Sequence, residues 1–438
     1  LADTPTVSTV VIGNRDGYGG WISLNQSTPY LASGASRAID EVPTGGTGYI
    51  YFNTATNTVE LHNYNDSSLS YYETRGICAT SGDLNIKLFG DNYIKSSSNG
   101  IYSTGKLTIS GSESGSNSLT LTDAGNGTTI YAEGTITIQS GAKVTAPGGQ
   151  SGQSIHMNND NSNSEIVIKD NGTVVNAVNS SSKGIIRCGH TTTNGKYVGA
   201  IRLKNGAELN ATEVQGTLYR DGDTHPVTTH SVSGKITCGE AGVADAIVQL
   251  NSTDTATNAA VIHLVARTKA DGTFKFASVP SGKYNVTVDK IGYTASLTSV
   301  EVGESDLQDQ DIILTPVSYG ISVQGTPVTG ANKDNVLGDG TVTYTPATTT
   351  EAQKLTLCNA NISASGTTKG IISTSGALDI ELIGENTITT DSNSINSSGA
   401  LTITSTSGHN GSLTMSSKNA NTTVYATAAI TISGSAVV

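Results

Sequence analysis

Short runs in which every second residue is apolar recur along most of this chain, with Thr or Ser between the apolar positions. Clear examples lie at residues 107–109, 119–121 and 136–138, and Gly, Ser or Asn bounds each of them. A period of two is typical of β-strands that bury one face, and Gly, Ser and Asn are typical of turns. No window has a helical stripe of apolar residues. The pattern predicts a chain built from short strands.

These runs belong to a repeated motif whose clearest copy is GIYSTGKLTI at 100–109. Copies begin at residues 76, 100, 129, 154 and 184, and again at 370, 394 and 423. Residues 81–144 align without a gap with residues 375–438, and 28 of the 64 aligned pairs are identical. One module has therefore been duplicated.

A repeat of this length is typical of a solenoid, in which each unit buries its apolar face on its neighbours. About three short strands in each repeat favour a parallel β-helix. Stacked coils would place Ile77, Ile101 and Ile130 in one column, with about 4.8 Å between successive coils. The composition agrees, because 5 % aromatic residues suit thin aliphatic ladders better than a large globular core.

Between the two repeat regions, alternating strands at 234–237, 246–250, 261–267, 274–276, 284–289 and 312–314 have the spacing of a β-sandwich. Asp271 and Gly272 predict a hairpin turn. The predicted fold class is all-β, with two parallel β-helix modules separated by the sandwich. Domains are expected at 1–228, including an N-terminal cap, at 229–316 and at 317–438. The second module ends in mid-solenoid, which predicts open strand edges and either continuation of the native protein or self-association through this end.

The sandwich segment contains GKIT, ADAIVQL and ARTKADGTFKFASVPSGKYNVTVDKIGY. It resembles the carboxypeptidase regulatory-like domain, a transthyretin-like fold related to the collagen-adhesin B repeats, and this resemblance implies that the domain is a spacer. A break in the repeat pattern at 221–230 predicts a linker before it. The solenoid contains GI-x-S-x-G-x-L-x-I and L-x-G-x-N-x-I, the latter around Asn92 and again around Asn386. These motifs resemble β-helical repeats of bacterial surface proteins of the carbohydrate-binding-domain type. Asn63 and Asn359, which match between the modules, either stack as an internal ladder or close turns, and we expect turns.

The formal net charge of −12 argues against nucleic acid as a partner and against binding of strongly anionic polymers by bulk electrostatics. The sequence printed from Leu1 does not open with a signal-peptide pattern, and no apolar run is long enough to insert into a membrane, so we expect a mature or trimmed fragment. The cysteines are Cys78, Cys188, Cys238 and Cys358. Cys78 and Cys188 follow motif copies four coils apart, about 19 Å, which is too far for a disulfide. We expect four free thiols.

Two groups of residues are candidates for binding. Tyr18, Trp21 and Tyr30 either plug the open core as a cap or form a stacking platform for sugar rings. Arg187, Arg202 and Lys204 lie in late coils of the first module, where charge concentrates, and Arg202 and Lys204 should point the same way, as a carboxylate-binding strip would require. The alternative for these late coils is a solvated charged face. The other titratable residues of the late coils are Asp160, Glu165, Lys169, Asp170 and His190.

The expected function is that of a non-catalytic secreted or cell-wall-associated adhesin that binds extracellular, cell-wall or host-surface glycans. A structural stalk or assembly subunit and a β-helix polysaccharide lyase or hydrolase remain alternatives. Glycoside hydrolysis needs two carboxylates, but of Asp83, Asp91 and Asp123 only Asp91 has an acidic counterpart in the second module, Glu385. No catalytic residue, cofactor or metal site is expected, and His225 and His230 lack the ligand spacing of a metal site.

Overall fold

The computed structural model describes residues 9–13, 21–66, 75–112, 116–123, 127–149, 153–159, 164–178, 184–191, 197–221, 225–253, 261–295, 298–405, 411–419 and 422–438. Every regular element among these residues is a β-strand. The described part contains no helix that is long and apolar enough to span a membrane. The chain forms two compact units, residues 1–288 with 297–312 and residues 289–296 with 313–438. The all-β prediction is confirmed.

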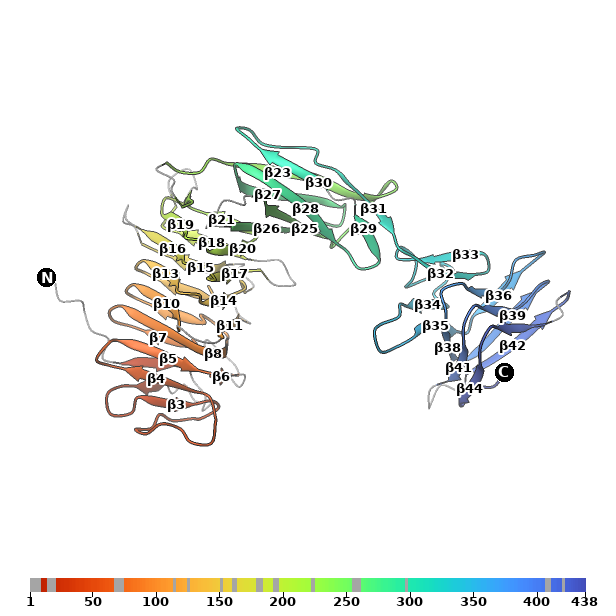
Figure 1. The fold of residues 1–438 in the computed structure, drawn as a ribbon, viewed down its shortest axis with the longest axis horizontal. Helices are drawn as coiled ribbons and strands as arrows, with labels where there is room; N and C mark the ends of the chain where they lie inside the picture. The colour runs from red at the N-terminus through yellow and green to blue at the C-terminus, as the bar shows by residue number, and fades with distance from the viewer. Residues whose placement is uncertain are drawn as a thin grey trace. The chain divides into compact units, whose positions relative to one another are not determined.

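The first unit begins with a parallel β-helix in which each coil contributes one strand to each of three sheets (Figure 1). Sheet A contains, in spatial order, β2 (Ile22–Leu24), β1 (Val10–Ile12), β7 (Ile77–Ala79), β9 (Ile101–Ser103), β12 (Ile130–Ala132), β15 (Gln153–Met157), β18 (Ile185–Cys188) and β21 (Glu213–Gln215). Sheet B contains β3 (Tyr30–Ala32), β4 (Tyr49–Asn53), β5 (Thr58–His62), the first half of β8 (Leu84–Ser96), β10 (Leu107–Gly111), β13 (Ile136–Gln139), β16 (Glu165–Lys169), β19 (Ala200–Lys204) and β22 (Thr217–Tyr219). Sheet C begins with β6 (Asn65–Asp66), the second half of β8, β11 (Asn117–Asp123), β14 (Lys143–Thr145), β17 (Val174–Asn176) and β20 (Glu208–Ala211).

The repeated motif stacks in register, as predicted. Ile101 is the partner of both Ile77 and Ile130 in parallel strands, and Ile130 is in turn the partner of Ile155. All four side chains are fully buried. One aliphatic column therefore runs along the solenoid, and each coil contributes one residue to it.

The N-terminal cap is aliphatic and antiparallel. Strand β1 pairs antiparallel with both β2 and β7, and the buried side chains of β1 and β2 include Ile12, Ile22 and Leu24. Trp21 precedes β2 and is 45 % exposed. Because the alternation of β2 turns Ile22 and Leu24 inward, these residues close the core without the tryptophan. The predicted aromatic plug is therefore wrong for Trp21.

A buried asparagine joins three successive coils in each module. Asn92 Oδ1 accepts a hydrogen bond from the Tyr64 backbone N–H at 2.8 Å, and its Nδ2 donates to the Ser118 carbonyl at 3.1 Å and the Gly90 carbonyl at 3.2 Å. Asn386 makes the same three bonds, with Ala360, Ser412 and Gly384. Both side chains are at most 2 % exposed. The Asn of the L-x-G-x-N-x-I motif is thus a structural link between coils.

The glycine of the same motif makes room for the preceding coil. Gly90 has φ +73°, and a Cβ there would collide with the side-chain oxygen of Asn63, which accepts a hydrogen bond from the Asp91 N–H at 3.2 Å. Asn63 itself has φ +48°. Gly384 and Asn359 repeat this arrangement in the second module. The expectation that Asn63 and Asn359 close turns is confirmed.

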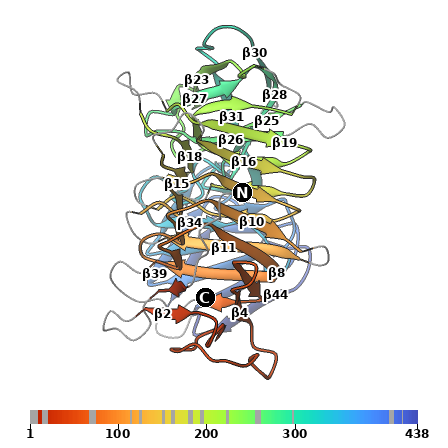
Figure 2. The same ribbon diagram turned by 90° about the vertical axis from the view of Figure 1, so that its left-hand side faces the viewer.

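The sandwich continues sheet C of the solenoid. Strand β26 (Val261–Arg267) pairs in parallel with β20, from Glu208 opposite Val261 to Ala211 opposite Leu264. Sheet C then continues through β25 (Ile247–Ser252), β28 (Gly282–Asp289) and β30 (Thr298–Val302), and the second sheet of the sandwich includes β23 (Thr229–Cys238), β24 (Ala241–Gly242) and β27 (Thr273–Pro280). Figure 2 shows the green sandwich strands following the last solenoid strands. The predicted linker therefore does not separate the sandwich from the coils.

Polar side chains reinforce this junction on the outer surface of sheet C. His263 Nδ1 lies 2.8 Å from Asn251 Oδ1, and His263 Nε2 lies 3.8 Å from the Glu208 carboxylate. Asn210 Nδ2 donates to the same carboxylate at 3.0 Å. Side chains of two solenoid residues and two sandwich residues thus form one network across the shared sheet.

The second unit contains the other solenoid module. Its three sheets are, in order, β33 (Thr326–Thr329), β32 (Ser318–Val323), β37 (Ile371–Ser373), β40 (Ile395–Ser397) and β43 (Val424–Ala426); β34 (Val342–Thr345), β35 (Gln353–Cys358), β38 (Leu378–Ile383), β41 (Leu401–Ser405) and β44 (Ile430–Gly434); and β36 (Asn361–Ala364), β39 (Glu385–Thr390) and β42 (Ser412–Ser417). Strand β29 (Tyr293–Ala295) pairs with β31 (Ile312–Pro316). In the last coil Ile430 and Ile432 are 48 % and 52 % exposed, whereas the matching Ile136 and Ile138 are buried under the next coil.

Candidate functional site

The outer face of sheet B carries a distinctive sequence of side chains. Outward positions of its strands alternate with buried aliphatic positions, so equivalent outward residues form columns along the solenoid. One column, which we call the sheet B column, contains Tyr51, Glu60, Lys87, Ser110, Gln139, Lys169 and Lys204. All seven side chains are half-buried and accessible from solvent.

Five aromatic rings lie together at the N-terminal end of this face. The Tyr49 and His62 rings stack at 4.6 Å between centroids, and His62 stacks on Phe89 at 4.4 Å. Tyr30 stacks on Tyr51 at 4.7 Å and meets Tyr49 edge-on at 6.0 Å. We call these five rings the aromatic patch. Alternation explains its position, since Ile50 and Phe52 of β4 point inward and Tyr49 and Tyr51 point outward.

Charged groups border the aromatic patch. The Glu60 carboxylate lies 3.1 Å from His62 Nε2, and the Lys87 ammonium lies 5.4 Å from the centroid of the Phe89 ring. Burial, followed by the neighbouring Tyr51, Tyr49 and Glu60, raises the pKa of Tyr30 above its ordinary value, so its hydroxyl stays protonated. The patch therefore combines ring surface with hydroxyl, imidazole, carboxylate and ammonium groups.

The late coils place Arg202 and Lys204 on the same face, as their spacing on one strand predicted. Arg202 Nε lies 2.9 Å from the Glu165 carboxylate, and its guanidinium lies 4.2 Å from the centroid of the Tyr219 ring. Both contacts occupy the guanidinium. Lys204 instead has Lys169 as its direct partner across the parallel strands β16 and β19. The structure thus pairs Lys204 with Lys169, which we call the lysine pair.

Arg187 belongs to a different face, the outer side of sheet A. Its Nε donates to Gln215 Oε1 at 2.7 Å, and its guanidinium lies 4.5 Å from the centroid of the Tyr197 ring. The outer side of sheet A carries a row of four aromatic rings, Tyr102, Tyr131, His156 and Tyr197, which we call the sheet A aromatic ladder. At the end opposite Tyr197, the Arg75 guanidinium covers the Tyr102 ring at 3.8 Å, and Tyr102 stacks on Tyr131 at 5.3 Å. Guanidinium groups therefore cover both ends of the sheet A aromatic ladder, and Arg187 does not lie with Arg202 and Lys204.

His156 occupies the middle of the sheet A ladder. Its ring meets Tyr131 and Tyr197 edge-on, and Arg187 is its partner on the next strand. Its Nε2 is buried without a hydrogen-bond partner in the described structure. Burial, followed by the charge of Arg187, lowers the pKa of His156 to about 4. The imidazole is therefore neutral in the folded protein at neutral pH.

Acid is expected to destabilise the first unit through His156. In the unfolded chain the imidazole binds a proton below about pH 6.5, whereas in the folded protein it stays neutral down to about pH 4. The free energy that the neutral histidine contributes to folding is fully present above about pH 6.5 and is lost as the pH falls from 6.5 to about 4. Allowing for partial solvent screening, we expect a loss of about 1–2 kcal/mol. Urea unfolding at pH 7.5 and 4.5 should show a smaller loss for His156→Phe than for the original chain, and equal losses would contradict this role.

Trp21 lies beside the edge strand β2 of sheet A, whereas Tyr30 belongs to the aromatic patch of sheet B. Tyr18 and Asp160 lie outside the described residues. Sequence reasoning missed Tyr49, Tyr51, His62 and Phe89 as site candidates. Their outward positions in the alternating runs YIYF, TVELH and LNIKLF were the available signal.

The solenoid carboxylates of the catalytic alternative are held by hydrogen bonds. Asp91 Oδ1 accepts bonds from the Ser116 hydroxyl and, at 2.7 Å, from the Ser118 hydroxyl, and these two bonds lower the Asp91 pKa. Asp83 Oδ1 accepts a hydrogen bond from the Lys106 N–H at 2.8 Å. The Asp123 side chain lies outside the described part. Asp91 is thus stabilised in its ionised form, which is the opposite of what a general acid needs.

Histidines and thiols form no further centre in the described structure. His230 Nδ1 lies 3.8 Å from the Asp306 carboxylate, and no cluster of three potential metal ligands occurs among the described residues. All four cysteines are free, as predicted. Cys188 is buried, its thiol donates to the Ala200 carbonyl at 3.2 Å, and burial raises its pKa to about 12. The Cys188 thiol is therefore a packing group.

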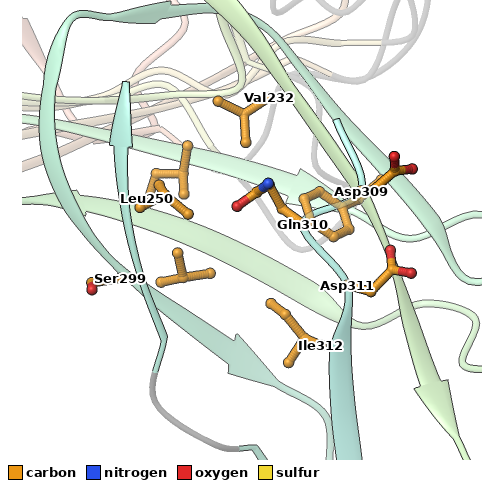
Figure 3. A pocket seen from close by; sticks show the side chains of 10 residues that line it. Val232, Leu250, Ser299, Asp309, Gln310, Asp311 and Ile312 are labelled. Carbon is orange, nitrogen blue, oxygen red and sulfur yellow. The ribbon is translucent and has the colours of Figure 1, made fainter. Parts of the chain in front are cut away.

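The sandwich contains a cavity of about 220 Å³ between its two sheets. Apolar side chains such as Leu250, Phe274 and Ile312 line it, together with Gln310 and two aspartates. Figure 3 shows the Gln310 amide directed among the apolar side chains, whereas the carboxylates of Asp309 and Asp311 point away from Leu250. Asp311 Oδ1 accepts a hydrogen bond from the Lys235 N–H at 2.8 Å. The cavity is a gap in the sandwich core, separate from the sheet B face.

Comparison with known proteins identifies the sandwich. No curated protein matches the chain. Residues 231–315 match the family model of the carboxypeptidase regulatory-like domain, and the segment has the strands and the Asp271–Gly272 turn expected for it, with Gly272 at φ +84°. Phe274, Phe276 and Tyr284 fill its core. The chain therefore contains a carboxypeptidase regulatory-like domain at residues 231–315, joined edge to edge to a parallel β-helix.

Proposed function

We propose that this chain is a non-catalytic, secreted or cell-surface protein that binds glycans on the outer face of sheet B. The observation that carries the proposal is the aromatic patch, in which five rings lie on the outside of a solenoid whose core needs none of them. Aromatic side chains with hydroxyl and imidazole edges suit sugars, whose rings have an apolar face and a polar rim. Outward aromatic clusters on soluble proteins commonly mark interaction sites.

The surroundings of the patch support a sugar ligand over a purely apolar one. Glu60 and Lys87 border the rings and, together with the imidazole of His62 within the patch, supply hydrogen-bond donors and acceptors. Farther along the sheet B column, Ser110 and Gln139 bond to each other at 3.2 Å and add a hydroxyl and an amide. A glycan parallel to the solenoid axis would meet one such side chain in each coil, about every 4.8 Å.

A structural stalk is the competing function, because stacked rings cover part of one another and the shared sheet stiffens the first unit. A lyase or hydrolase is the other alternative. The ionised state of Asp91 and the engagement of Glu165 by Arg202 support the non-catalytic proposal over this one.

A glycan array followed by titration of the best-bound oligosaccharide tests the proposal. Tyr51→Ala with Phe89→Ala should weaken binding about tenfold, since each ring contact contributes roughly 0.5–1.5 kcal/mol. Tyr131→Ala, which removes a ring from sheet A, is the matched control and should leave affinity unchanged. Absence of binding to any glycan would favour the stalk. New reducing or unsaturated ends after incubation with pectin or xylan would establish an enzyme instead.

A further inference from the structure

The lysine pair places two positive charges side by side at the far end of the sheet B column. Lys169 and Lys204 are direct partners on neighbouring parallel strands and both point outward. Neighbouring strands lie about 4.8 Å apart, and like charges in such positions repel each other. Within the described structure neither ammonium has a carboxylate at ion-pair distance.

Acidic side chains around the lysine pair bond to other groups. Asp221, which follows β22, accepts a hydrogen bond from the Asn205 N–H at 3.0 Å through Oδ2. Glu165 pairs with Arg202 at 2.9 Å. Asp170 Oδ2 accepts a hydrogen bond from the Ser140 N–H at 3.1 Å, and its Oδ1 accepts one from Asn205 Nδ2 at 3.4 Å. The chain therefore neutralises an arginine on this face and leaves the two lysines in contact with solvent.

The sheet B column connects the lysine pair to the aromatic patch. From Tyr51 it continues through Lys87, Ser110 and Gln139 before it reaches Lys169 and Lys204. Lys87 and Lys169 are three coils apart, which corresponds to about 14 Å and a few sugar units. Glu60, the acidic member of the column, lies at the aromatic end and pairs with His62.

We propose that the glycan bound by this face is an acidic polysaccharide, a uronate-containing chain, and that the lysine pair binds its carboxylates. This inference rests on the proposed glycan-binding function and adds the class of ligand. The net charge of −12 opposes long-range attraction of an anionic polymer, so recognition depends on contact. At 0.15 M salt the Debye length is about 8 Å, which screens the distant acidic groups but leaves a direct ammonium–carboxylate contact in place.

Polygalacturonate and its fully methyl-esterified form provide the test, because they share a backbone and differ in the carboxylate charge. The original chain should bind polygalacturonate about tenfold more tightly than the ester in 0.15 M salt, as expected for two exposed ion pairs. Lys169→Gln with Lys204→Gln should abolish this preference and leave binding of the ester unchanged. Lys95→Gln with Lys143→Gln removes the same charge from sheet C and should retain the preference.

Thermal unfolding separates this role from a structural one. Because the lysines repel each other, Lys204→Gln should unfold at an equal or slightly higher temperature than the original chain while it binds polygalacturonate less tightly. Equal binding of acid and ester, unaffected by the lysine double variant, would overturn the inference and leave the proposed glycan binding in place. Absence of binding to both polymers and to every glycan on the array would remove the proposed function itself.

Discussion

Replacement of Asn92 by alanine is expected to lower the free energy of unfolding of the first unit by about 3 kcal/mol. The substitution leaves the Tyr64 N–H and the Ser118 carbonyl without the partner that the asparagine provides. Each buried polar group left unpaired costs about 1–3 kcal/mol. Because a solenoid is stabilised by contacts between neighbouring coils, the loss should be greatest around β8 and β11. Urea unfolding gives the magnitude, and hydrogen exchange gives the location.

Two other variants separate hydrogen bonding from packing at this position. Asn92→Asp has nearly the same shape, but a carboxylate cannot donate to the Ser118 and Gly90 carbonyls, so it should destabilise at least as much as alanine. Asn85→Ala, on the same strand, removes only a half-exposed side chain with one bond to the Asn57 carbonyl at 3.3 Å and should cost less than about 1 kcal/mol. A stable Asn92→Asp variant would show that the buried amide is not the link between coils. Asn386 offers the same test in the second unit.

The solenoid could be predicted from sequence because its information is local and repeated. Each copy of the motif specifies a strand, a turn and an inward residue, and the constant order of the copies specifies the stacking of Ile77, Ile101 and Ile130. The buried Asn and the positive-φ Gly of L-x-G-x-N-x-I occur at matching places in both modules. The same repetition explains why the strands of both modules could be located without any homologue.

The candidate site could be predicted only in part, because it depends on pairing between distant strands. Alternation places Arg202 and Lys204 on one face, but only the register shows that Lys169 adjoins Lys204 and that Glu165 pairs with Arg202. Tyr30 joins the aromatic patch through antiparallel pairing of β3 with β4, which no repeat specifies. Arg187 is near Arg202 in sequence but lies on sheet A, since each coil divides its strands among three faces.

The junction with the sandwich could not be predicted for a similar reason. A break in the repeat near residues 221–230 indicates where the solenoid pattern ends, but the partner of its last sheet C strand is β26, about 50 residues farther along the chain than β20. No local feature of the sequence specifies that β20 pairs with β26. The pairing of β20 with β26 changes the role expected for the carboxypeptidase regulatory-like domain, which was that of a spacer. The domain covers a sheet edge that the solenoid would otherwise expose.

A core substitution in the sandwich is therefore expected to destabilise the solenoid beside it. Phe276 is 1 % exposed, and Phe276→Ala should cost about 3–5 kcal/mol as a large-to-small change in a packed core. Since β26 continues sheet C, loosening the sandwich removes a neighbour from β20. Amide exchange should accelerate most in β20, less in β17 and least in β8, as expected when stability is transmitted between adjacent coils.

Leu382→Ala is the matched control for this coupling. Leu382 is fully buried in the core of the second unit, so the substitution should cost a similar amount, about 2–5 kcal/mol, within that unit. Exchange in β20 and β17 should remain unchanged, because these strands belong to the first unit. If Phe276→Ala accelerates exchange only within residues 229–316 and leaves β20 protected, the sandwich unfolds as an independent spacer. A graded loss of protection from β20 toward β8 requires instead that the pairing of β20 with β26 transmits stability into the coils.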